Sequence, residues 1–314
     1  MKTASLPGSL ARALFTLLLA TSLWCLLDHA SAQLYVGLAG NNTVSEYNAS
    51  TGATINANLI TTGLNYPAAL ALSGNTLYVA SASGNSVGEY NATTGAAINA
   101  SLITSGLNFP RGLAVSGSDL FVVNGGNGTV GEYNAGTGAA INASFITGFG
   151  TPFGIALSGN NMYVADQEGG SVGEYNATTG ATINASLVTG LSSEAGIVVS
   201  GNNLFVAGLN ANTVGKYNAT TGAAINASFI TGVNTPLSVA ISGNDLFVAT
   251  GGGDTVGEYD ATTGAPINAN FLPGLNTPIS LAVAPAPEPG SAALLALGLA
   301  GMLANRRRRP ASAS

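Results

Sequence analysis

The sequence predicts an all-β fold, a six-bladed β-propeller with four antiparallel strands in each blade, whose ring is closed by a C-terminal strand that joins the N-terminal blade. A repeat, a cassette and a phase difference support this prediction. Six tyrosines recur at intervals of 43, 43, 42, 42 and 42 residues: Tyr47, Tyr90, Tyr133, Tyr175, Tyr217 and Tyr259. Each lies in the same cassette of short apolar runs and glycine turns, without a helical period. A period near 42 residues with four short strands is typical of a propeller blade.

The strands of one cassette differ in polarity, which ranks them from the centre of the ring outward. Residues 112–115 and 120–123 are apolar at successive positions, as expected of strands packed on both faces, and we name them strands A and B. Residues 130–133 mix apolar and polar side chains and form strand C. Residues 141–146 include Asn142 and Ser144 and form strand D. We therefore expect strand A at the centre and strand D at the rim.

The two ends of the repetitive body differ in phase. The body begins with a strand B at residues 34–37 and ends with a strand A at residues 279–283. The last strand can therefore complete the first blade, and closure removes the exposed edges that an open array would have. A linear β-solenoid is the alternative architecture, and it gives no reason for this difference in phase.

The first 32 residues have the pattern of a secretory signal peptide. Lys2 and Arg12 give a weakly basic start, residues 13–27 are apolar, and Ala30-Ser31-Ala32 is a small-residue cleavage pattern. We expect cleavage after Ala32, a propeller over residues 33–284 and a separate tail over residues 285–314.

The tail combines a short motif, an apolar stretch and a basic cluster. Residues 292–304 are apolar, and as a helix they would reach about 20 Å against a hydrocarbon core of about 30 Å, enough for a transient anchor only. The motif and the cluster are Pro287, Glu288, Pro289, Arg306, Arg307, Arg308 and Arg309. This order resembles the PEP-CTERM sorting signal. The resemblance implies an exported precursor held at the inner membrane, processed by an exosortase, and then located at the cell surface or outside the cell. An ordinary tail anchor is the alternative.

The composition of the body excludes several functions. Residues 34–284 contain twelve acidic residues and two basic ones, Arg111 and Lys216, for a charge of −10. Such a surface repels phosphate backbones, which argues against nucleic-acid binding. Cys25, His29 and Trp24 all lie in the signal peptide, so the body lacks disulfides, His/Cys zinc sites and Ser-His-Asp or Cys-His nucleophiles.

The cassette is similar to NHL-type and YVTN-type propeller repeats, in which Pro-x-Gly-(Ile/Leu)-Ala precedes a Leu-Tyr-Val-Ala strand. The residues that carry the resemblance include Pro110-Arg111-Gly112-Leu113-Ala114 and Leu77-Tyr78-Val79-Ala80. The cassette lacks the basic residues typical of NHL repeats and adds a Thr-Gly hairpin. The resemblance therefore implies the fold and says little about function.

Candidate binding residues concentrate in two kinds of loop. The loops from D to A and from B to C emerge on one face of a four-stranded meander, and these segments vary most between cassettes. We name this face the variable face. Its candidates are Arg111, Asn124, Asp166, Glu168, Glu194, Asn210 and Asp254. Such variation fits a ligand-binding surface, and sequence drift in unconstrained loops would look similar.

Three functions agree with these features. The leading hypothesis is a secreted, non-enzymatic binding or structural scaffold linked to exopolysaccharide or biofilm matrix, with polysaccharide or envelope proteins as partners and no cofactor. The alternative is a Ca²⁺-dependent lactonase or lyase, since Ca²⁺ prefers oxygen ligands such as Asp166, Glu168, Glu194 and Asp254. A rigid surface-layer protein without a ligand is the third.

The glutamates repeated in strand C, such as Glu46 and Glu89, are interpreted as exposed or turn-bonded positions.

Overall fold

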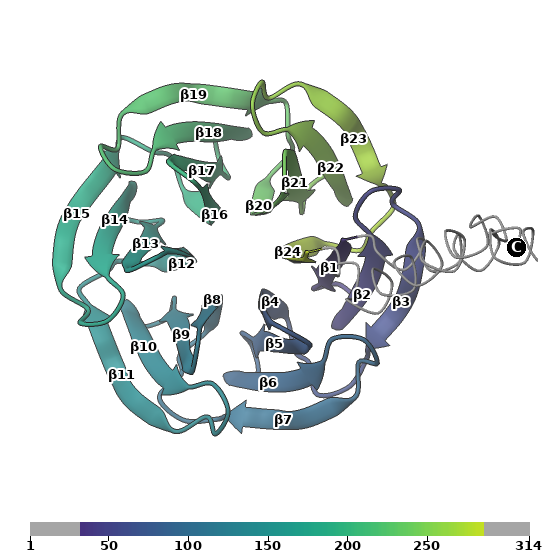
Figure 1. Ribbon diagram of the computed structural model, residues 1–314, viewed down its shortest axis with the longest axis vertical. Coiled ribbons are helices and arrows are strands. Elements are labelled where there is room, and N and C mark those ends of the chain that lie inside the picture. Colours follow the sequence, from purple (N-terminus) through teal and green to yellow (C-terminus); the bar gives the residue numbers. More distant parts are fainter. Residues whose placement is uncertain (1–31, 286–314) are drawn as a thin grey trace, which may run out of the picture. The chain divides into compact units, whose positions relative to one another are not determined.

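The computed structural model describes residues 32–285, and residues 33–284 form one compact unit of 24 strands. The strands make six antiparallel sheets of four, arranged as blades around a ring (Figure 1). This part of the chain contains no helix, and so none that could cross a membrane. The predicted six-bladed propeller is confirmed.

Each blade contains one strand of each kind, hydrogen-bonded in the order A, B, C and D. Blade 1 consists of β24 (Pro278–Ala284), β1 (Gln33–Leu38), β2 (Thr43–Asn48) and β3 (Thr54–Ile60). Blade 2 consists of β4 (Pro67–Ser73), β5 (Thr76–Ser81), β6 (Ser86–Asn91) and β7 (Ala97–Ile103). Blade 3 consists of β8 (Pro110–Ser116), β9 (Asp119–Asn124), β10 (Thr129–Asn134) and β11 (Ala140–Thr147).

The remaining blades repeat this pattern. Blade 4 consists of β12 (Pro152–Ser158), β13 (Asn161–Asp166), β14 (Ser171–Asn176) and β15 (Thr182–Thr189). Blade 5 consists of β16 (Glu194–Ser200), β17 (Asn203–Gly208), β18 (Thr213–Asn218) and β19 (Ala224–Thr231). Blade 6 consists of β20 (Pro236–Ser242), β21 (Asp245–Thr250), β22 (Thr255–Asp260) and β23 (Pro266–Leu272).

The polarity of the strands places them as predicted. Strand B is almost wholly buried, as in β5 and β9, whereas the first five residues of strand D are mostly exposed, as in β7. Strand A lies nearest the centre and strand D at the rim (Figure 1). Apolar strands are thus enclosed between neighbouring blades, where burial of their side chains stabilises the ring.

The Gly-Glu-Tyr segment of strand C has a steric basis. The Tyr133 side chain lies back over Gly131, where an added Cβ would be 2.7 Å from the ring and 3.0 Å from the hydroxyl. Its hydroxyl donates to the Gly106 carbonyl of the loop that precedes the blade, at 3.1 Å. Tyr90 makes the corresponding contact with Thr62 at 3.5 Å. In blades 2 and 3 the recurring tyrosine therefore fastens the D–A loop to strand C, and Gly88 or Gly131 provides the space for its ring.

The inner strands of adjacent blades approach closely at small residues. A Cβ at Gly112 would lie 2.6 Å from the Phe153 carbonyl, and one at Gly154 would lie 2.4 Å from the Ala195 carbonyl. Because these positions carry no side chain, β8, β12 and β16 can lie side by side around a narrow axis.

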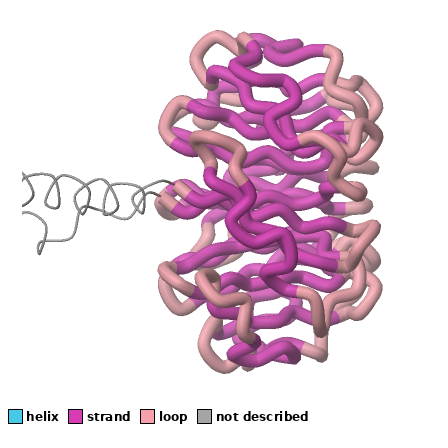
Figure 2. The backbone as a smooth tube through the Cα atoms, turned by 90° about the vertical axis from the view of Figure 1, so that its right-hand side faces the viewer, coloured by secondary structure: helices cyan, strands magenta, loops and turns pink. Residues whose placement is uncertain are grey.

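The ring closes through β24. This strand pairs antiparallel with β1, from Gln33↔Ala284 to Leu38↔Pro278, and the Ser280 hydroxyl donates to the Pro67 carbonyl at 2.8 Å. The predicted closure is confirmed, and the β-solenoid alternative is wrong. Gln33 and Ala284 meet on the face that carries the A–B turns, opposite the variable face. Figure 2 shows loops along both faces.

Three of the strand C glutamates differ from the expectation of exposed or turn-bonded positions, whereas Glu89 and Glu132 are half-buried. Glu46, Glu174 and Glu258 are only 2%, 6% and 7% exposed. Burial raises the pKa of each carboxyl above its ordinary value.

The signal peptide and the sorting tail, with Pro287, Glu288, Pro289 and Arg306–Arg309, lie outside the described residues.

Candidate functional site

A channel runs along the axis of the propeller between the six strands A. Its narrow part has a volume of about 80 Å³ and is lined by the second to fourth residues of these strands, and a wider part of about 330 Å³ follows toward the A–B turns. The lining is aliphatic at equivalent positions: Leu70, Leu113, Ile155, Ile197, Val239 and Leu281. The side chains that line the channel are therefore mostly aliphatic, and Arg111, Ser238 and Ser280 are its polar members.

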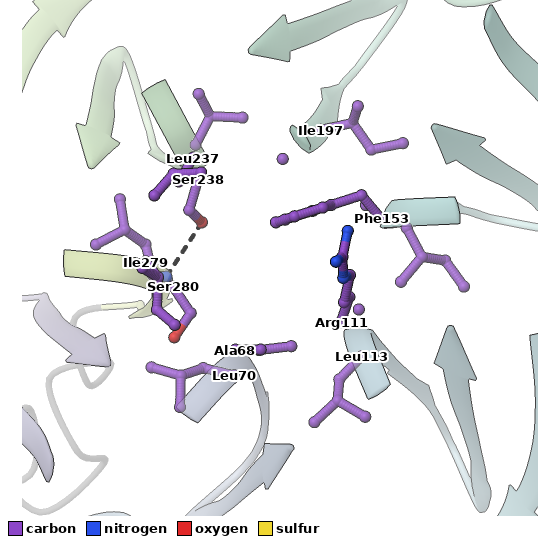
Figure 3. A pocket seen from close by; sticks show the side chains of 17 residues that line it. Ala68, Leu70, Arg111, Leu113, Phe153, Ile197, Leu237, Ser238, Ile279 and Ser280 are labelled. Carbon is purple, nitrogen blue, oxygen red and sulfur yellow. Dashed lines mark hydrogen bonds between the residues drawn. The ribbon is translucent and has the colours of Figure 1, made fainter. Parts of the chain in front are cut away.

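Arg111 is the one charged side chain in this lining. It is the second residue of β8 and lies at the channel mouth beside Phe153 (Figure 3). Its guanidinium carbon is 4.9 Å from the centre of the Phe109 ring and 5.2 Å from that of Phe153. It donates to Gln167 Oε1 at 3.4 Å. A cation between two aromatic rings is favourably placed and orients its remaining N–H groups.

Partial burial affects this guanidinium without removing its charge. Burial lowers the pKa of Arg111 from its ordinary value, and the nearby Tyr66 side chain partly opposes this shift. An arginine remains protonated despite such a shift. Tyr66 is 39% exposed, and its ring centre lies 6.3 Å from that of Phe109. The mouth thus combines one positive charge with three aromatic rings.

Three predicted site residues hold the loops of the variable face in place. The fully buried Asn124 accepts from the Asn108 amide at 3.1 Å, and Asp166 accepts from the Gly150 and Thr151 amides at 3.0 and 2.9 Å. Asp254 accepts from the Thr277 amide at 2.9 Å. Asn124 and Asp166 tie a D–A loop to the end of strand B, and Asp254 ties a D–A loop to a B–C loop, so these polar groups are engaged within the protein.

The other predicted residues differ in their exposure. Glu168 is exposed and accepts from the Thr151 hydroxyl at 3.3 Å, and Asn210 is exposed in the loop after β17. Glu194 is fully buried within blade 5. None of these three residues, nor Asn124, Asp166 or Asp254, belongs to the channel lining, which of the predicted residues contains Arg111 alone.

The carboxylates do not assemble a cation site in the described part of the chain. No group of three or more His, Cys, Asp or Glu side chains lies close enough together there to hold a metal ion. The arrangement therefore gives no support to the Ca²⁺-dependent lactonase or lyase.

Sequence reasoning missed the aromatic residues around Arg111. Phe153 follows Pro152 just as Arg111 follows Pro110, so alignment of the cassettes would have placed both at the mouth on adjacent strands. Tyr66 and Phe109 each precede a strand A proline and have positive φ values of 60° and 53°. This backbone is uncommon for aromatic residues, and no composition signal marks it.

Known structures resemble the fold at low sequence identity. A chain in the crystal structure of a nidogen/laminin complex has a TM-score of 0.68 and 16% identity, covering 81% of this chain and 98% of that chain. The computationally designed Ika8 protein has a TM-score of 0.50 and 17% identity, covering 78% and 73%. These similarities show the fold alone. No curated protein matches this sequence.

Two family models match parts of the chain. The LVIVD repeat matches residues 150–172, which extend from just before β12 to the start of β14. The PEP-CTERM protein-sorting motif matches residues 285–309, directly after the propeller. This motif indicates export of a membrane-associated precursor, processing by an exosortase, and a final place at the cell surface or outside the cell. The chain is a six-bladed propeller that carries a PEP-CTERM sorting motif.

Proposed function

We propose that the protein is a non-catalytic binding scaffold whose variable face holds a carboxylate-bearing sugar of an exopolysaccharide or matrix polymer. The observation that carries this proposal is the Arg111 guanidinium at the channel mouth, held between Phe109 and Phe153. A guanidinium can donate two parallel hydrogen bonds to one carboxylate. Aromatic rings provide flat apolar area for the C–H face of a sugar ring.

The charge of the body decides which polymers fit. A dense polyanion would meet a body charge of −10 and only one cation at the mouth. A mostly neutral chain with an occasional uronic acid avoids that repulsion and still gives Arg111 a partner. Attachment to the cell surface or matrix through this face would suit an exported protein.

Binding of defined oligosaccharides tests this function. We expect the protein to bind a glucuronate-containing neutral oligosaccharide more tightly than the neutral oligosaccharide, polygalacturonate or heparin in isothermal titration calorimetry. Arg111→Met should weaken binding of the glucuronate-containing oligosaccharide by roughly tenfold or more, because a charge-assisted bidentate contact is lost.

The control removes the other positive charge of the body. Lys216 is buried between blades 5 and 6, where its ammonium donates to the Ala261 carbonyl at 2.9 Å. Lys216→Met changes the net charge as much as Arg111→Met does, and it should leave oligosaccharide binding unchanged. Equal affinity of wild type and Arg111→Met would refute the role of Arg111 in sugar binding. No binding of any oligosaccharide would refute the proposal and leave a rigid scaffold without a sugar ligand.

A further inference from the structure

Blade 5 departs from the other blades at two residues that face each other. Strand A begins with proline in the other five blades: Pro67, Pro110, Pro152, Pro236 and Pro278. In blade 5 it begins with Glu194, whose partner in the register is Gly208. The partners of the five prolines all carry side chains: Leu38, Ser81, Asn124, Asp166 and Thr250.

The missing side chain at Gly208 coincides with a cavity. In blade 2, Ser81 accepts from the Asn65 amide at 3.3 Å and so occupies the space beneath the D–A loop. In blade 5 a cavity of about 350 Å³ lies between the D–A loop and strands β16 to β19. One water needs about 10–15 Å³ of such volume, so the cavity can hold a ligand of several heavy atoms.

Glu194 is one of the residues around this cavity, and its carboxyl lies behind the cavity wall without a hydrogen-bond partner in any other residue. The side chain is 0% exposed, and both of its oxygens are buried and unpaired. A buried polar group without a partner is costly, and a buried charge more so. Proteins rarely retain such a group unless something else satisfies it.

The surroundings determine the charge that a ligand must bring. Among the lining residues only Glu194 and Tyr217 titrate, and Asp166 of blade 4 adds a second negative charge nearby. Burial raises the pKa of Glu194 to about 7; its own backbone N–H lowers it in part, and Asp166 raises it further. Burial also raises the pKa of Tyr217, and the Glu194 charge adds to that rise. No basic side chain lines the cavity.

We propose that this cavity binds a small organic cation, an alkylammonium whose N–H groups donate to the Glu194 carboxylate once that side chain turns toward the cavity. The carboxylate only accepts hydrogen bonds, so it needs a donor, and a cationic donor also neutralises its charge. Leu191, Val206 and the Tyr217 ring supply apolar walls for the alkyl part. The exposed Ser192, Ala211, Ala227 and Ser228 form a rim through which a ligand can enter.

A matched set of four-carbon probes tests this site. We expect n-butylammonium to bind the wild-type protein at pH 8 in isothermal titration calorimetry, and 1-butanol and butyrate to bind at least tenfold more weakly. At pH 5 butylammonium should bind roughly 100-fold more weakly, because a carboxyl with a pKa of about 7 is then about 1% ionised while the amine stays protonated.

Two variants separate recognition from folding. Glu194→Gln keeps the shape and should reduce butylammonium affinity at pH 8 by tenfold or more. The double variant Glu194→Pro with Gly208→Ser reproduces blade 2, so it should fold and bind none of the probes. Arg111→Met should bind butylammonium like the wild type, since the two sites are separate.

Three results would overturn the proposal. They are equal binding of 1-butanol and butylammonium, unchanged butylammonium affinity in Glu194→Gln, and no binding of butylammonium to a folded wild-type protein. The last would indicate that ordered water alone satisfies Glu194.

Discussion

Buried acids are the most unusual single residues of this propeller. Burial raises the pKa of the strand C glutamates Glu46, Glu89, Glu132, Glu174 and Glu258, and of Glu194. For Glu132 and Glu258 nearby aspartates add to the effect of burial. A carboxyl whose pKa is higher in the folded than in the unfolded chain favours folding in its protonated form.

The stability of the protein should therefore fall as the pH rises. The contribution of protonated Glu194 is full below its unfolded pKa of about 4.5 and is lost as the pH rises through its folded value of about 7. The shift corresponds to about 3 kcal/mol at most, or roughly 5–10 °C for a domain of this size. We expect a higher Tm at pH 5 than at pH 8 in scanning calorimetry.

Glu194→Gln isolates the part that one residue contributes. This variant places a neutral amide, which cannot ionise, at the position of the carboxyl. The difference in Tm between pH 5 and pH 8 should therefore shrink by more than half. The strand C glutamates would account for the remainder. An identical difference in both proteins would contradict the assignment of the effect to Glu194.

At the level of elements, the B–C and D–A loops of adjacent blades are joined by one recurring device. A residue of positive φ in the B–C loop accepts a hydrogen bond from an amide in the next D–A loop, as Asn85 does from Phe109 at 2.6 Å. The residues that do this are Asn42, Asn85, Asn212 and Asp254. Asp254 thus joins blade 6 to blade 1. In the register of the cassettes, Gly128 and Gly170 occupy this position in blades 3 and 4.

Substitutions of Asn85 separate the hydrogen bond from the backbone conformation. Asn85→Gly removes the acceptor but tolerates the φ of 48°, and should cost about 1 kcal/mol of unfolding free energy. Asn85→Ala adds the strain of a left-handed residue with a Cβ, roughly 1 kcal/mol more. Urea unfolding measures both. An alanine variant as stable as the glycine variant would show that the strain is absent.

The blades could be predicted from the sequence, but the orientation of every side chain could not. The period near 42 residues and the apolar runs predicted all six sheets, and β8 and β10 extend the predicted strands by only one or two residues at each end. Arg111 and Glu194 were both predicted for the variable face, yet they are the second and first residues of their strands. Side chains alternate along a strand, so one lines the channel and the other the blade interior.

For the molecule as a whole, closure of the ring depends on a blade made from both ends of the chain. β24 supplies strand A of blade 1, and β1, β2 and β3 supply the rest. β24 is therefore paired with β1 in its own sheet and lies beside the strands A of both neighbouring blades, β4 and β20. The predicted closure was possible to infer because the phase of the repeat at residue 34 differs from that at residue 283.

A circular permutant tests this closure directly. Gln33 and Ala284 are paired at the positions that Thr76 and Ser73 occupy in blade 2, where Gly74 and Asn75 form the turn. A two-residue Gly-Asn link should therefore join Ala284 to Gln33 as an ordinary A–B hairpin. New ends between β23 and β24 would make blade 1 continuous in the chain. We expect this permutant to fold with a Tm within a few degrees of the unpermuted propeller in circular dichroism.

The control contains the same link but opens the chain inside β9, which interrupts a buried strand B and should prevent folding. If the ends of the propeller were far apart, a link this short would distort β1 and β24, and the first permutant would unfold like the control.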